Sequence, residues 1–171
     1  MKKTAWWLCA VAACVACGLL GCRRASEKMA EKAIERGLRQ SGGGDAQVDL
    51  SGGKMTIKTA EGEMEFSGGE SVALPAGFPD DVYVDPKAKL RAAMKTPQGF
   101  MLNLESPLAR DAAAEAIDAA MKAKGWSQEA SVDMSEMRSI SYKKGNRTAA
   151  AIVMTQEGAT QITLTVMSDQ G

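Results

Sequence analysis

The sequence predicts an α+β fold: a curled antiparallel sheet in ββαββββ order packed on one long helix, preceded by a three-stranded β-meander and an N-terminal amphipathic helix. Three observations support this prediction. Short runs that alternate apolar and polar residues flank a single long helical pattern at 107–124. Turn residues separate these runs at short intervals, which favours antiparallel neighbours. One helix lying on a curled sheet is then the simplest way to bury both apolar faces.

Composition and turn residues divide the chain into five parts. Residues 1–21 form an apolar leader, and 22–45 hold an amphipathic helix and a glycine-rich linker. Residues 46–69 form the meander, 70–88 a proline-rich connector, and 89–171 the α+β domain. Each proline biases the residue before it toward an extended conformation, so we expect the connector to run stiffly across the domain.

The segment at 26–38 has helical periodicity. Ser26 is a favourable N-cap, and the apolar residues that follow at helical spacing are Met29, Ala33, Ile34 and Leu38. We expect an amphipathic helix that lies on a bilayer, pairs with a partner helix or docks on its own domain. A partly frayed tether is the alternative, because the apolar stripe is thin.

The meander alternates between an apolar and a charged face. Its apolar positions are Val48, Leu50, Met55, Ile57, Met64 and Phe66. The glutamates at 61, 63 and 65 fit the charged, solvated face better than a catalytic pair. Because so short a meander is marginal alone, we expect its apolar face to pack on the following domain or on a partner.

Alternation also predicts six strands in the α+β domain. Two precede the helix, at 89–95 and 99–105, and four follow it, with turns near Ser135, at 145–146 and at 157–158. In the first of the six strands, the side chains expected to face the core are Leu90, Ala92 and Met94. The strand after the helix should turn inward Trp126, Ala130, Val132 and Met134.

The helix at 107–124 has recognisable start and stop signals. Ser106 is the predicted N-cap, Pro107 takes the first helical position, and Gly125 follows the last residue. Its inward face is broad and rich in alanine, so the helix can lie close to the sheet.

The charge balance argues against nucleic-acid binding. The chain has 21 basic and 21 acidic residues, and loss of Lys2 and Lys3 with the leader would leave 19 against 21, a net charge of about −2. The 150 residues after the leader are enough for one domain with a real core.

The residue types that catalysis needs are scarce. Histidine is absent, which excludes Ser-His-Asp and Cys-His catalysis and histidine-ligated metals. The cysteines are Cys9, Cys14 and Cys17 in the leader and Cys22 directly after it. No acidic pair stands in the apolar setting that a glycosidase needs. We therefore expect no enzymatic activity and no cofactor.

Soft-metal binding is the chemistry that this composition leaves open. Ten methionines follow the leader, and Met134 and Met137 have the M-x-x-M spacing used by Cu(I) sites. Thioethers also fill irregular cores, and most of these methionines fall at predicted inward positions. Met134 and Met137 are therefore only weak candidates for a metal site.

Three basic residues crowd the turn at 145–146: Lys143, Lys144 and Arg147. Contact with anionic lipid, lipopolysaccharide or a partner is one interpretation. The simpler one, which we favour, is that a basic turn keeps the hairpin soluble.

The first 21 residues have the order of a secretory signal. Lys2 and Lys3 precede an uncharged run at 5–20, whose 16 residues fall short of the roughly 20 that a membrane-spanning helix needs. A removed signal is therefore favoured over a permanent span.

The end of the leader, Leu19-Leu20-Gly21-Cys22, resembles the lipobox of bacterial lipoproteins. The resemblance implies cleavage between Gly21 and Cys22, a diacylglycerol on the Cys22 thiol, and a further acyl chain, such as palmitate, on the new N-terminus. Two or more chains anchor stably where one would not. By the sorting rule of that family, Arg23 in place of aspartate points to the periplasmic face of the outer membrane. An ordinary cleaved signal is the alternative.

From Leu74 onward, the chain loosely resembles small exported bacterial domains of unassigned function, which carries over no functional residues. We expect a non-catalytic, lipid-anchored envelope protein that contacts the membrane through Cys22 and binds another envelope component. A small-ligand or Cu(I) carrier in the periplasm is the alternative, and a cell-wall hydrolase is a less favoured one.

Overall fold

The computed structural model describes residues 26–40, 46–51, 53–60, 62–69 and 72–168. The predicted anchor residues Gly21 and Cys22 lie outside the described residues, as do Arg23 and Glu61. Within the described part, no helix is both long enough and apolar enough to cross a bilayer.

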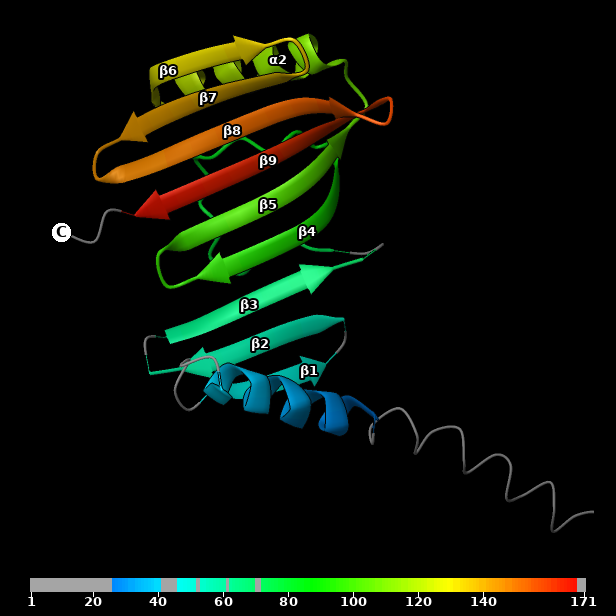
Figure 1. Cartoon of the computed structure of the whole chain (residues 1–171). Helices are drawn as coiled ribbons and strands as arrows, with labels where there is room; N and C mark the ends of the chain where they lie inside the picture. Colours follow the sequence, from blue (N-terminus) through cyan, green and yellow to red (C-terminus); the bar gives the residue numbers. More distant parts are fainter. Residues whose placement is uncertain (1–25, 41–45, 52, 61, 70–71, 169–171) are drawn as a thin grey trace, which may run out of the picture.

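The described strands form one antiparallel sheet in the order β1-β2-β3-β4-β5-β9-β8-β7-β6 (Figure 1). They are β1 (Gln47–Ser51), β2 (Lys54–Thr59), β3 (Gly62–Gly68), β4 (Lys89–Thr96), β5 (Gly99–Ser106), β6 (Ser127–Met134), β7 (Met137–Lys144), β8 (Arg147–Gln156) and β9 (Ala159–Ser168). The helices are an N-terminal one at 26–40 and α2 (Arg110–Ala123). The α+β prediction is confirmed. The meander, β1 to β3, is continuous with the domain, because β3 pairs with β4.

One side of the sheet, which we call the covered face, carries the core. Helix α2 packs there on β6 to β9, and the connector at 72–88 lies on the same side. Phe78 of the connector meets Phe100 of β5 edge to face, with ring centroids 5.5 Å apart. The most deeply buried large side chains on or against this face are Leu102, Met121, Ile140, Tyr142, Val153 and Leu164.

The opposite side over β4 to β9, which we call the open face, has no helix on it in Figure 1. Its members follow from the register with the buried residues and include Lys89, Ala92, Met94, Met101, Asn103, Glu105, Ala130, Val132, Met134, Met137, Ser139, Ser141, Lys143, Thr148, Ala150, Ile152, Met154, Gln161, Thr163, Thr165 and Met167. The apolar side of the meander continues this face. Leu50, Met55, Phe66, Met94 and Met101 are directly opposite one another on β1 to β5.

The inward residues predicted for β4 and β6 are partly wrong, because each strand contains a β-bulge. In β4, the register shifts between Leu90 and Ala92, so Ala93 is buried while Ala92 and Met94 lie on the open face. An extra residue in one strand reverses the alternation beyond it.

The same happens in β6, where the register shifts between Gln128 and Ala130. Trp126 is buried as predicted, but Ala130, Val132 and Met134 are exposed on the open face.

The start of α2 also differs from the prediction. The helix begins at Arg110, and its N-cap, Ala109, makes no side-chain capping bond. Ser106 instead accepts the Leu108 N–H at 3.2 Å, which forms a local turn before the helix. The predicted end is correct, since Gly125 follows the C-cap with φ +84°.

The N-terminal helix docks on its own domain, one of the three arrangements expected. Figure 1 shows it beside β1, in front of the sheet, whereas α2 lies behind the opposite end. Its half-buried residues include Glu31, Ile34, Glu35 and Leu38. The predicted apolar stripe is therefore partly wrong, because Met29 is 77% exposed and Ala33 is also exposed.

Candidate functional site

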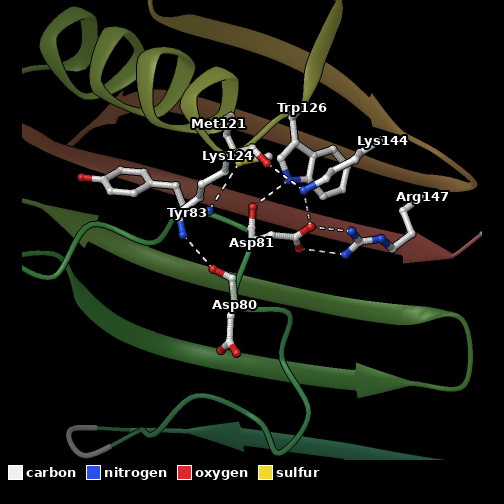
Figure 2. Close-up of polar contacts among 8 residues, drawn as sticks. All are labelled: Asp80, Asp81, Tyr83, Met121, Lys124, Trp126, Lys144 and Arg147. Atoms are coloured by element: carbon white, nitrogen blue, oxygen red, sulfur yellow. Dashed lines mark hydrogen bonds and ion pairs between the residues drawn. The ribbon is translucent and has the colours of Figure 1, made fainter.

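Two regions concentrate polar or exposed apolar side chains: a cluster around Asp81, which ties the connector to the domain, and the open face. In the Asp81 cluster, the carboxylate accepts hydrogen bonds from Lys144 Nζ at 2.7 Å and from Arg147 Nη1 at 2.9 Å (Figure 2). The Trp126 indole N–H donates to the Asp81 backbone carbonyl at 2.7 Å. The Arg147 guanidinium also lies 5.1 Å from the centroid of the Trp126 ring.

The electrostatics of this cluster keep Asp81 ionised. The hydrogen bond from Arg147 holds the pKa of the Asp81 carboxyl well below its ordinary value, and Lys144 lowers it further. Desolvation acts in the opposite direction and is outweighed. A carboxylate held in this way is a poor general acid or base near neutral pH, because it does not take up a proton there.

The cluster instead fastens three parts of the chain together. Lys124, the C-cap of α2, donates to the Asp80 carbonyl at 2.7 Å, and Lys144 donates to the Lys124 carbonyl at 2.7 Å (Figure 2). The connector is thereby held against α2 and the β7–β8 hairpin. Lys144 and Arg147, expected at the tip of a solvated basic turn, are engaged by Asp81. The third residue of that set, Lys143, is exposed on the open face.

A hollow of about 400 Å³ lies beside this cluster, along the connector. It is lined by Leu74, Pro75, Gly77, Phe78, Pro79, Asp80, Val82, Tyr83, Val84 and Lys124. Among the described residues, no group of three or more histidine, cysteine, aspartate and glutamate side chains is placed to hold a metal ion. The hollow is therefore lined mostly by apolar residues, and its charged lining residues are Lys124 and Asp80.

The open face is the larger feature. Five large apolar side chains on its surface or its continuation into β3 are exposed by 37 to 52%: Phe66, Met101, Val132, Met134 and Met167. Between them lies a shallow hollow of about 340 Å³, whose open-face lining includes Ser141, Thr148, Ala150 and Thr165. Its charged members are Glu105, which pairs with Arg91 at 2.6 Å, Lys89 directly opposite Glu105, and Lys143. Glu129 lies beside Lys143 at the hollow.

The structure brings together the two methionines singled out from sequence. Met134 and Met137 are directly opposite each other at the β6–β7 turn. Met154 of β8 is in turn directly opposite Met137. Sequence spacing pointed to the first two, but Met154 lies 17 residues further along the chain, and only the strand register links it to them.

Compared with known proteins, the chain matches no family model, no curated protein and no solved structure.

Proposed function

We propose that this chain is a non-catalytic, lipid-anchored protein of the cell envelope, which binds another envelope protein through the open face. The observation that carries the binding proposal is the open face itself, where methionines, a valine and a phenylalanine are exposed among serine and threonine side chains, with its charged residues near the ends of the strands. Protein interfaces are enriched in methionine and aromatic residues and depleted of charge at their centre. Monomeric proteins rarely leave a large contiguous apolar patch exposed without a partner.

The anchor proposal is supported by the sequence motif. Leu19-Leu20-Gly21-Cys22 lies at the end of an uncharged run of 16 residues, which is shorter than the roughly 20 that a membrane-spanning helix needs. Acyl chains on Cys22 would hold the domain at the membrane, and Arg23 favours the periplasmic face of the outer membrane. The described part of the N-terminal helix starts at Ser26, four residues after Cys22, so the sheet would lie close to the lipid surface.

Mass spectrometry of the protein from native membranes tests the anchor. We expect a chain that begins at Cys22 and carries acyl groups there. A Cys22→Ser variant should keep its leader and leave the lipid-modified fraction. An intact leader on the native protein, or a Cys22 without acyl groups, would refute the anchor.

Site-specific photo-crosslinking in membranes tests the binding surface. A benzophenone residue at Met101 or Ile152 on the open face should form an adduct with the same partner, identified by mass. The same residue at Glu115, exposed on α2, is the matched control and should not. Thr165→Arg, which adds a charge between these positions, should abolish both adducts. Equal adducts from all three positions, or none, would contradict the proposal.

A further inference from the structure

Three thioethers lie in one row on neighbouring strands at one end of the open face. Met134, Met137 and Met154 are successive register partners across β6, β7 and β8. Directly opposite residues on antiparallel strands share a face and have Cβ atoms about 4.5–5.5 Å apart. The row therefore puts three methionine side chains within reach of a common point above the sheet.

These methionines do not fill the core. The core lies on the covered face, and Met121 is its methionine. Met134 is 52% exposed, and Met137 and Met154 are half-buried on the open face. The usual structural reason for methionine, filling an irregular gap between packed elements, does not apply to a row at a two-residue turn on the surface.

The chemistry of this row fits one class of ligand. Thioethers are soft, uncharged donors that select Cu(I) and its analogue Ag(I) over hard divalent cations. Each methionine has three rotatable side-chain bonds, so three sulfurs from adjacent strands can converge on one ion. The turn that joins the first two methionines contains the acidic Glu136. The Arg110 guanidinium, which donates to the Met134 carbonyl at 2.6 Å, is itself paired with Asp133 at 2.9 Å, so its positive charge is balanced beside the row.

We propose that Met134, Met137 and Met154 form a three-thioether site for Cu(I). The site does not depend on the anchor or on the protein partner, so its failure leaves the proposed function untouched. The three ligands come from neighbouring strands, and the sheet fixes the distance between these strands. Because Met134 is exposed, a soft monovalent ion can reach the site directly from solvent.

Silver titration of the full chain in detergent tests the site directly. Thiols are first blocked with N-ethylmaleimide, because the leader cysteines or Cys22 would otherwise compete for the metal. With methyl-labelled methionine, one equivalent of Ag(I) should shift three methyl resonances by NMR, assigned to Met134, Met137 and Met154 by single Leu variants. Cu(I) affinity is then measured by competition with bicinchoninate under reducing conditions.

Matched variants locate the ligands. Each of Met134→Leu, Met137→Leu and Met154→Leu should weaken Cu(I) affinity by about tenfold or more. Loss of a residue that only supports a metal ligand already lowers affinity by about that factor, and loss of a ligand itself should cost at least as much. The double variant Met94→Leu with Met101→Leu removes another pair of opposite methionines and should leave the affinity unchanged. Leucine conserves volume, so the fold should persist in every variant.

Three results would overturn this site. One is the absence of a silver-induced shift. Another is that silver shifts the methyl resonances of the methionines in the order of their exposure, so that Met29, which is 77% exposed, responds before the proposed row. The third is loss of affinity in the Met94 and Met101 double variant with none in the variants of the proposed row.

Discussion

The two ends of the sheet bury their apolar residues on opposite faces. At the β6–β9 end, the core is on the covered face, under α2; Ala151 and Val153 of β8 are fully inaccessible there, as is Leu102 of the adjoining β5. At the β1–β3 end, the apolar residues turn to the other face, where the N-terminal helix lies (Figure 1). Between the two ends, the apolar row from Leu50 to Met101 runs out from under the helix onto the open face. The open face is therefore exposed because the two joined halves of the sheet bury their apolar residues on opposite sides.

The two ends also use different interactions. The α2 end is closed by apolar packing and by the ion pairs of Asp81. The β1 end is closed by the N-terminal helix, whose Glu31 and Glu35 carboxylates accept the backbone N–H groups of Leu50 and Val48 at 2.9 and 3.1 Å. An edge strand covered in this way cannot pair with another chain. We therefore expect the α2 end to determine global stability, and the β1 end to determine local opening.

The largest expected effect on the free energy of unfolding distinguishes the apolar packing under α2 from the packing at the β1–β3 end. Leu102→Ala should lower the free energy of unfolding by about 3–5 kcal/mol, because the side chain is 0% exposed and its removal leaves a cavity. Ile57→Ala in β2, which is only half-buried, should lower it by less than about 2 kcal/mol. Urea denaturation checks both, and similar losses would show that the two ends contribute equally.

The next effect compares ion pairs at the two ends. Asp81→Asn should lower the free energy of unfolding by about 1–3 kcal/mol, because it weakens charged hydrogen bonds that are partly shielded from water. Glu63→Gln removes the exposed pair with Lys58 and should cost less than about 0.5 kcal/mol.

Acid should weaken the Asp81 contribution to stability. Because the pKa of Asp81 is lower in the folded than in the unfolded state, its stabilisation is fully present above the ordinary value, 3.8, and is lost as pH falls below that value. The stabilities of wild type and Asp81→Asn should therefore differ most at pH 7, and the difference should begin to narrow below pH 3.8 and close only below the folded-state pKa. A gap that widens on acidification would contradict the assigned direction.

A smaller effect should appear at the β1 edge. Replacing both Glu31 and Glu35 by Ala removes the acceptors of the Val48 and Leu50 N–H groups, so amide exchange at these positions should accelerate. We expect a global loss of only about 1 kcal/mol, the typical net value of such bonds. Arg36→Ala, on the exposed side of the same helix, should leave both exchange rates unchanged.

The smallest expected effect on stability falls on the open face. Val132→Lys should change the free energy of unfolding by less than about 0.5 kcal/mol, because the side chain is already 51% exposed. The same variant should lose the crosslinked adduct of the open face. A large loss of stability would instead indicate that this surface is part of the core.

Local signals in the sequence predicted the turns and most of the elements. Gly145 and Gly158 adopt positive φ in two-residue hairpins, as the turn pattern required. The inward residues of β4 and β6 could not be predicted, because a single bulged residue reverses every later position. The side of the sheet that each half buries, and the proximity of Met154 to Met137, depend on strand pairings between distant segments.

The position of β9 sets an order of assembly. It lies between β5 and β8, although it follows both in the chain, and it is the only described strand that joins β1–β5 to β6–β8. The complete sheet therefore cannot form until residues 159–168 have been synthesised. Until then, β5 and β8 each lack the strand that pairs with one of their edges, so the β1–β5 half and the β6–β8 half of the sheet stay unjoined.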